Sequence, residues 1–199
     1  VIDNRITQKQ KESALTVDVL DMIAIKETPS ANFYDGLGAL KGVDITSASL
    51  GFKVINTRGF NSTSPVRSLQ IIDGVDNQSP GLNFSLGNFL GSSELDIMRV
   101  EIIQGASSAY YGPNAFNGVI SMETKESYDF PGVLTELKVG ERGLNQLAVR
   151  YADYFTNDEG RKTFGYKVNA FYMQAYDWEA ENYNPTQDSE HDATNPGGY

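Results

Sequence analysis

The chain has 199 residues, of which 40% are hydrophobic and 21% charged, and this balance excludes a disordered chain and favours a globular one. Its 26 acidic and 16 basic residues give a net charge of −10, which argues against a nucleic-acid partner because phosphate binding needs a basic surface. Cysteine is absent, which excludes a disulfide framework, thiolate chemistry and Cys-ligated metal sites.

The first half of the chain, to about Lys125, mixes short helices with short strands. Residues 28–45 predict a helix with Phe33, Leu37 and Leu40 on one face and a stop at Gly42. Four strands are also predicted there, in residues 51–60, 68–75, 97–105 and 118–125.

Two features of this half concern the segments between the strands. A short helix is predicted just before the third strand, capped by Ser92 or Ser93, with Glu94 and Asp96 in its acidic first turn. Two long polar segments, residues 61–68 and 76–93, join other elements, and connections of this length in a compact domain are usually functional or disordered. The second contains several large apolar side chains, so we expect it to pack or to bind something.

The second half changes its period. Residues 133–140, 144–155 and 163–176 alternate apolar and polar side chains, which predicts three consecutive antiparallel strands. No window reaches the ~20 apolar residues of a membrane helix, but the later strands have the ~9 to 11 residues of a membrane-spanning strand. Aromatic residues flank the apolar band at both ends, as membrane interfaces favour. The alternation by itself fits a soluble sheet equally well.

No residue constellation argues for chemistry. His191 is the only histidine and lies in an acidic stretch, so no catalytic triad can be built around it. Glu94 and Asp96 are explained by their positions at a helix start. Residues 36–42 have the wrong glycine spacing for dinucleotide binding, and residues 73–79 lack the ligands of an EF-hand. We therefore predict no enzyme activity, no metal site and no cofactor.

Three motifs in fixed order carry a family resemblance. The stretches "NTRGF", "LQIIDGV" and "VEIIQGASSAYYGPNAFNGVISMETK", followed by alternating strands, resemble the plug domain of a TonB-dependent outer-membrane receptor, most closely those of Bacteroidota. The resemblance implies an α+β plug, a small mixed β-sheet with short helices, followed by the first antiparallel strands of a transmembrane β-barrel of about 22 strands. It implies an N-terminal extension at 1–14, the plug at 15–127, and three barrel strands with an acidic extracellular loop at 132–199.

The resemblance also assigns roles to individual residues. Arg58 matches the plug arginine that pairs with carboxylates of the barrel wall, and Gln104 stands where a second basic residue is usual. The loops after "RGF" and "DGV" match the plug apices that face the ligand, and they carry Asn61, Ser62, Ser64, Arg67, Asn77, Gln78, Asn83 and Phe84. The motif residues expected to shape the plug are Gly59, Asp73, Gly74, Glu101, Gly105, Gly112, Asn117 and Gly118. Tyr110 and Tyr111 should meet the plug core or the barrel wall.

The function implied by the resemblance is energy-coupled uptake of a scarce nutrient, such as a metal chelate, vitamin, glycan or peptide. The expected partners are the TonB complex, outer-membrane lipid, the nutrient and, in one branch of the family, a surface lipoprotein. No part of residues 1–13 matches a TonB-contacting segment. A soluble or surface-attached binding module is the alternative, with the two polar loops as its recognition surface. An enzyme acting through Glu94, Asp96 or His191 is a third and weaker hypothesis.

Overall fold

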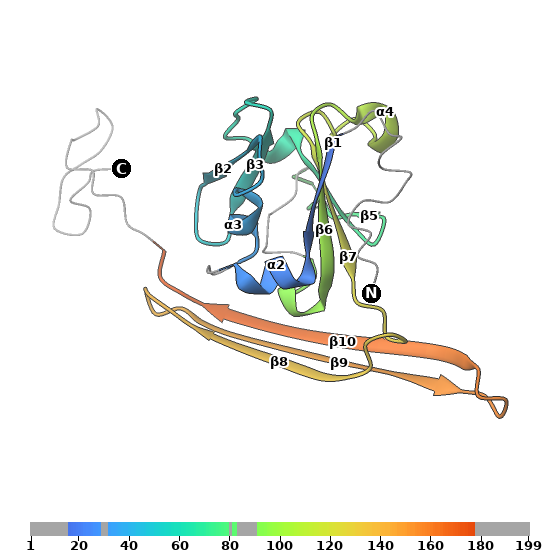
Figure 1. The fold of residues 1–199 in the computed structure, drawn as a ribbon. Helices are drawn as coiled ribbons and strands as arrows, with labels where there is room; N and C mark the ends of the chain where they lie inside the picture. Colours follow the sequence, from blue (N-terminus) through green and yellow to red (C-terminus); the bar gives the residue numbers. More distant parts are fainter. Residues whose placement is uncertain (1–15, 29–31, 80, 83–90, 178–199) are drawn as a thin grey trace.

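The computed structural model describes residues 16–28, 32–79, 81–82 and 91–177 (Figure 1). Its larger sheet has five strands in the order β1-β6-β7-β4-β5. These strands are β1 (Thr16–Asp21), β4 (Leu69–Ile72), β5 (Val75–Asp76), β6 (Ile97–Gln104) and β7 (Val119–Thr124). Only β4 and β7 pair in parallel, so the predicted small mixed sheet is confirmed.

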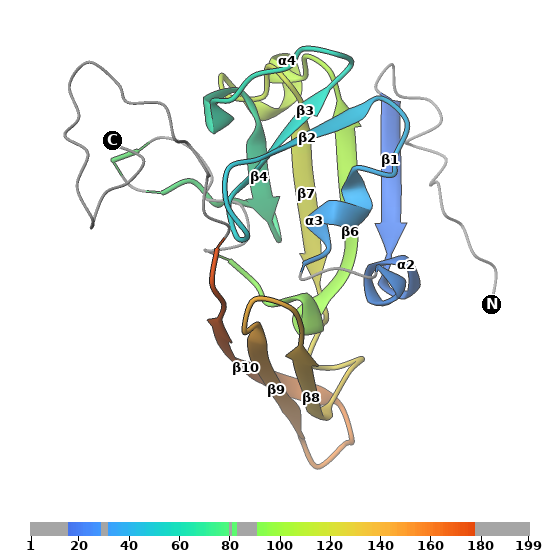
Figure 2. The ribbon, with the colours of Figure 1, turned by 90° about the vertical axis from the view of Figure 1, so that its left-hand side faces the viewer.

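Short helices and a hairpin cover one face of this sheet. They are α2 (Met22–Glu27), α3 (Tyr34–Leu37) and the hairpin of β2 (Val43–Ser47) with β3 (Lys53–Thr57). The main core lies between these layers and includes Phe33, Leu37, Val100 and Ile102, each at most 1% exposed. Figure 2 shows α3 and the hairpin in front of the sheet.

The helix predicted over residues 28–45 is shorter than expected. Its described helical part is the four residues of α3, and Gly36 and Gly38 explain this because glycine is a poor helix former. Phe33 and Leu37 are buried as predicted, and Leu40 packs partly on the core. The pattern missed α2, because six residues are too few to display a helical period.

The helix predicted before β6 is a single 3-10 turn, η2 (Glu94–Asp96), with Glu94 and Asp96 in its first turn as predicted but without the predicted serine cap. Ser93 occupies the cap position but its side chain makes no capping hydrogen bond. Glu94 and Asp96 instead pair with cations of the second sheet. Their positions therefore reflect contacts between the sheets more than the electrostatics of a helix start.

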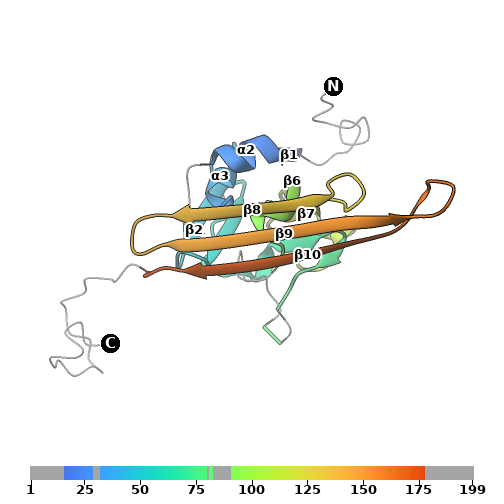
Figure 3. The ribbon, with the colours of Figure 1, turned by 90° about the horizontal axis from the view of Figure 1, so that it is seen from below.

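The predicted three-stranded antiparallel sheet is confirmed. Its strands are β8 (Gly132–Val139), β9 (Asn145–Thr156) and β10 (Lys162–Gln174), in the order β10-β9-β8. One face is exposed and apolar, with Leu137 71%, Val168 61% and Tyr172 60% accessible. The other face turns towards the five-stranded sheet and buries Gln146, Ala148, Arg150 and Ala152 of β9. Figure 3 shows the three strands side by side with the rest of the chain behind them.

The five-stranded sheet stands with one end on the buried face of the three-stranded sheet (Figures 1 and 2). Small residues allow this approach. Ala148 and Ala152 are buried on β9, and a Cβ atom on Gly165 of β10 would collide with the side chains of Ser127 and Tyr128. In the described parts of the chain, no helix is long and apolar enough to cross a membrane.

Candidate functional site

The contact between the two sheets is centred on a buried ion pair. Arg150 lies on the inward face of β9 and its side chain is 0% exposed. Its Nε donates to Asp96 Oδ1 at 2.5 Å, and its two terminal nitrogens donate to the carbonyl oxygens of Phe130 (2.7 Å) and Lys125 (3.1 Å). The carbonyl partners matter because a buried guanidinium is tolerated only when its remaining donors are also satisfied.

The second oxygen of Asp96 receives two further donors from the three-stranded sheet. Lys167 Nζ lies 3.0 Å from Asp96 Oδ2, and Asn169 Nδ2 donates to the same oxygen at 3.1 Å. Both residues lie on the inward face of β10, opposite Ala152 and Arg150 of β9. The carboxylate of Asp96, in η2 just before β6, is therefore held by three side chains from two strands of the three-stranded sheet.

Glu94 makes a second connection, to β8. It pairs with Lys138 and also accepts a hydrogen bond from the amide of Phe33, at the start of α3. Burial raises the pKa of Glu94, and this effect exceeds the opposing effects of Lys138 and the Phe33 amide. Glu94 thereby ties β8 to the layer of helices that covers the main core.

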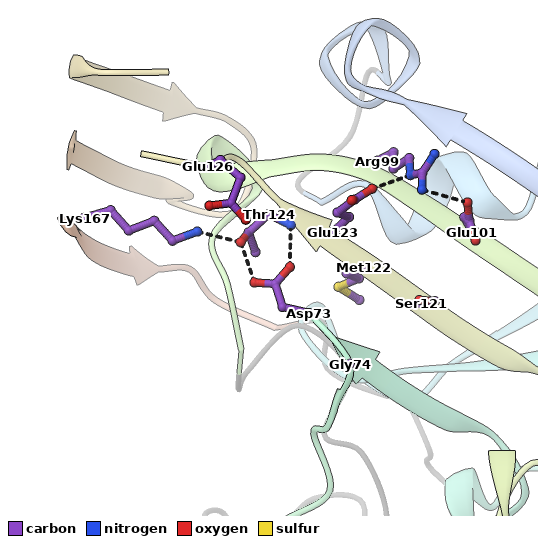
Figure 4. A pocket seen from close by; sticks show the side chains of 10 residues that line it. All are labelled: Asp73, Gly74, Arg99, Glu101, Ser121, Met122, Glu123, Thr124, Glu126 and Lys167. Atoms are coloured by element: carbon purple, nitrogen blue, oxygen red, sulfur yellow. Dashed lines mark hydrogen bonds and ion pairs between the residues drawn. The ribbon is translucent and has the colours of Figure 1, made fainter. Parts of the chain in front are cut away.

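A third connection runs from β10 to the hairpin of β4 and β5. Lys167 Nζ donates to Thr124 Oγ1 at 2.5 Å, and Thr124 donates to Asp73 through its hydroxyl (2.5 Å) and its amide (2.8 Å). Figure 4 shows this chain of contacts from Lys167 to Asp73. Asp73 and Gly74 form the hairpin turn at φ +49° and +81°, the left-handed conformation that an Asp-Gly turn favours. We call the Asp96, Glu94 and Lys167 contacts together the junction.

Neighbouring Lys125 completes the junction. Its Nζ donates to the carbonyl of Leu95 at 2.5 Å and its amide to the carbonyl of Asp96 at 2.7 Å. Burial lowers the pKa of Lys125, and the nearby positive charges of Lys26 and Arg150 act in the same direction.

The two residues expected to contact the barrel wall, Arg58 and Gln104, lie away from the junction. Arg58 is exposed at φ +55° and donates to Thr16 Oγ1 at 2.9 Å. Gln104 is buried inside the five-stranded domain, where its Nε2 donates to Asp18 (2.5 Å) and to the carbonyl of Lys41 (2.8 Å). Contacts of either residue with further wall strands stay a prediction.

The predicted ligand-facing loops leave from one end of the β4–β5 hairpin. Residues 61–68 precede β4, and Asn77 follows β5. The backbone N–H of Asn77 donates to the backbone carbonyl of Gln70 at 2.8 Å. Of the predicted residues, Asn61, Ser64 and Arg67 are exposed and Ser62, Asn77 and Gln78 half-buried. Asn83 and Phe84 lie outside the described residues. The structure thus brings the described parts of both loops to the same end of the hairpin, and their role towards a ligand stays a prediction.

The motif residues shape the five-stranded domain. Asn117 is buried and its amide group accepts from Thr57 N (3.2 Å) and donates to Asn56 Oδ1 (2.8 Å) and the Phe60 carbonyl (2.9 Å). Gly105 has φ +84°, and a Cβ atom there would approach Arg58 Nη1 to 2.9 Å. The other motif residues lie in turns or on strand faces. Gly59, Gly112 and Gly118 have positive φ, and Glu101 pairs with Arg99.

Of the two contacts expected for the tyrosines, the structure excludes the one with the plug core. Tyr110 is 73% and Tyr111 39% exposed, so neither belongs to the core of the five-stranded domain. They lie on α4 (Ser108–Tyr111), at the end of the sheet far from the junction (Figure 1). A contact with other wall strands stays a prediction.

The junction is not evident from the sequence because its partners are far apart in the chain. Asp96 and Arg150 are separated by 54 residues. One signal was present: Arg150 sits between Ala148 and Ala152 on the same face of its strand, where small residues mark a close approach.

Comparison with known proteins now decides the family. Residues 9–119 match the family model of the TonB-dependent receptor plug domain. The chain belongs to this family. We therefore call the five-stranded domain the plug and the strands β8, β9 and β10 the wall.

Known relatives agree with this assignment. The chain is 31% identical over 160 residues to the vitamin B12 transporter BtuB of Vibrio vulnificus, covering 79% of this chain and 25% of that protein. Its fold resembles Pseudomonas aeruginosa FpvA bound to heterologous pyoverdines, with a TM-score of 0.62 at 18% identity, over 83% of this chain and 21% of that one. The siderophore receptor PirA of Acinetobacter baumannii gives a TM-score of 0.59 at 19% identity, over 84% and 26% of the two chains.

The comparisons also show how much of its relatives' length the chain covers. It spans about a quarter of the length of the curated relative it matches. The predicted fold, a plug followed by the first antiparallel wall strands, is confirmed by the family match and by the structural likeness. The closer resemblance to receptors of Bacteroidota stays a prediction.

Proposed function

We propose that the protein is a receptor of the Gram-negative outer membrane that imports a scarce nutrient, energised by the TonB complex of the inner membrane. The junction is the observation that carries the proposal. It seats a folded plug on the inward face of wall strands, through Asp96, Arg150 and Lys167. A plug in that position closes the lumen of a barrel, and a closed lumen needs an energised step to pass a solute.

The outward face of the wall supports a membrane location. Aromatic side chains gather towards the turn between β9 and β10, where the exposed Phe155 and Phe164 and the half-buried Tyr166 stack on one another. Apolar side chains such as Val168 follow along the same face, with Tyr172 further on. An apolar band edged by aromatic residues is the pattern of a strand sheet that faces lipid.

The nutrient class we propose is a metal chelate or a vitamin, in line with the names of the relatives. The vitamin B12 transporter and the siderophore receptor are named for such compounds. The described residues of the predicted ligand-facing loops are mostly neutral and polar, which suits hydrogen bonding to a multidentate ligand. A soluble or surface-attached binding module is the alternative, and the continuation of the gene tests it directly. Several hundred further residues of alternating strands favour the receptor, and a stop codon near Tyr199 favours the module.

The test uses cells that express the full-length receptor. Uptake of radiolabelled cyanocobalamin and of 55Fe-loaded siderophores is measured with and without a protonophore, in strains with and without TonB. We expect uptake of at least one compound, which collapses when the proton-motive force or TonB is removed. Uptake that persists without either would contradict the proposal.

A further inference from the structure

One acidic side chain lies on the outward, apolar face of the wall. Asp153 of β9 shares this face with Tyr151 and Phe155, two residues away on either side, and stands directly opposite Tyr166 of β10. Both strands next to β9 are described, and in the described part of the chain no cationic side chain forms an ion pair with Asp153. Ionisable groups at membrane depth are usually paired, so this carboxylate indicates a cation from outside the described chain.

Aromatic rings adjoin this carboxylate along both strands. The ring centroids of Tyr151 and Tyr166 lie 5.8 Å apart. The ring of Phe155 lies 5.8 Å from that of Tyr166 and 6.2 Å from that of Phe164. Tyr151, Phe155 and Phe164 are 39%, 59% and 60% exposed, so much of their ring surface is accessible. The negative faces of aromatic rings attract ammonium groups, and a carboxylate among them adds a full opposite charge.

Hydrogen bonds hold the carboxylate in place and leave room for a ligand. The backbone N–H of Tyr154 donates to Asp153 Oδ1 at 2.8 Å, and the hydroxyl of Tyr151 donates to Asp153 Oδ2 at 3.3 Å. An ionised carboxylate accepts about four hydrogen bonds, so both oxygens keep acceptor capacity. On the other side of β9, the strand β8 begins at Gly132, opposite Ala152, so no residue of β8 pairs with Asp153.

We propose that Asp153 and the aromatic rings beside it form a binding site for the headgroup of a phospholipid that carries an ammonium group. The carboxylate pairs with the ammonium, and the exposed ring faces add cation–π attraction. The acyl chains follow the apolar side chains of the same face, such as Val168. The inference rests on the proposed function, because it takes this face to lie in a membrane.

The position of the site in the wall fits such a ligand. It lies towards the turn between β9 and β10, at the end of the apolar band and not at its middle (Figure 3). Headgroups meet a barrel at the aromatic girdles that edge its apolar band. The predicted extracellular loop follows the other end of β10, so this girdle is the predicted periplasmic one and meets the phospholipids of that leaflet.

The test measures lipid binding to the purified full-length receptor by native mass spectrometry from nonionic detergent, without nutrient or TonB. Phosphatidylethanolamine and phosphatidylglycerol with the same acyl chains are added in turn, since only the first carries an ammonium group. We expect wild type to bind phosphatidylethanolamine about tenfold more tightly, which corresponds to one charge-assisted contact. Asp153→Asn removes the charge but keeps the size and an acceptor oxygen, and it should abolish this preference. Asp158→Asn is the matched control, because it removes the same charge from the exposed turn beyond β9 and should leave the preference unchanged.

A pair of ring variants tests the aromatic part of the site. Tyr166→Phe keeps the ring and should retain most of the preference, whereas Tyr166→Leu should reduce it about threefold. The site is refuted if wild type binds both lipids equally, if Asp153→Asn keeps the preference, or if Tyr166→Leu binds phosphatidylethanolamine as tightly as Tyr166→Phe. Lipid binding is measured independently of uptake, so a negative result leaves the proposed import function to its own test.

Discussion

Asp96 of the plug and Arg150 of the wall form an ion pair with side chains 2% and 0% exposed and an Nε–Oδ1 distance of 2.5 Å. Taking both charges out of water is costly, and the pair is tolerated because Lys167, Asn169 and two backbone carbonyls complete its hydrogen bonds. A pair of this kind contributes less to net stability than to orientation. It permits one seating of the plug on the wall, since any other seating leaves these charges buried without partners.

Glu94 predicts a specific pH dependence. Its pKa is raised in the folded protein. At a pH between the ordinary carboxyl pKa and this raised pKa, the folded protein therefore binds a proton at Glu94 more readily than the unfolded chain does. The contribution of Glu94 to the unfolding free energy is therefore fully present below the ordinary pKa and is lost as the pH rises through the raised pKa. The measurement is thermal unfolding of the full-length receptor, for wild type and for Glu94→Gln, from pH 4 to pH 7. We expect the unfolding free energy of wild type minus that of Glu94→Gln to fall as the pH rises over this range. Glu159→Gln, in the exposed turn after β9, is the control, and a difference that rises with pH would refute the assignment.

Asn117 is predicted to hold the plug together. Asn117→Leu keeps the branched shape and the number of heavy atoms but leaves the Thr57 amide and the Phe60 carbonyl without this partner. Each unsatisfied buried group costs about 1–3 kcal/mol, so we expect the unfolding free energy of the receptor to drop by about 2–4 kcal/mol in urea. The nearby, half-buried Asn114→Leu is the control. Equal effects of the two substitutions would argue against the role of Asn117.

Val168 tests whether the exposed face of the wall meets lipid. Val168→Arg places a charge in the middle of the apolar band, and such a substitution costs about 2–4 kcal/mol at the centre of a bilayer. Gln174→Arg lies on the same face at the end of the strand, where the cost falls to about 0–1 kcal/mol. We expect folding into lipid vesicles to be impaired by the first substitution and to proceed normally with the second. A soluble sheet would tolerate both.

Arg58 is predicted to be a second fastening of the plug. Its side chain is exposed and makes one described hydrogen bond, to Thr16, which leaves other guanidinium donors for the predicted contact with wall carboxylates. Arg58→Ala should then loosen the plug and increase the leak of the detergent-purified receptor in bilayers. Arg67→Ala, which removes a cation from over the Phe116 ring, is the control. Unchanged conductance of Arg58→Ala would remove the fastening role.

Much of the fold could be predicted from local sequence signals. The period-2 alternation placed the three wall strands and assigned Leu147 and Arg150 to opposite faces, as the burial of each confirms. The strands predicted at 97–105 and 118–125 are present as β6 and β7, which pair with each other. These signals are local because a strand repeats every two residues and an Asp-Gly turn needs only its own φ values.

The junction could not be predicted in the same way. Nothing near Asp96 in the sequence indicates that Arg150 will meet it, and a charged residue at a helix start has a sufficient local explanation. The face of β9 that looked polar in the sequence is in fact its buried face, because the plug covers it. The polar side chains of this strand face therefore contact polar groups of the plug and are not exposed to solvent.

The central claim is that the Asp96–Arg150 pair seats the plug on the wall, and a double-mutant cycle tests it most directly. Asp96→Ala, Arg150→Met and the double variant are compared with wild type by the unfolding free energy of the full-length receptor in micelles. Each single substitution leaves a buried partner uncompensated and should cost about 3–5 kcal/mol, whereas the double variant should cost clearly less than the sum. We predict a coupling energy of at least about 2 kcal/mol. Costs that add to within about 0.5 kcal/mol would contradict the account.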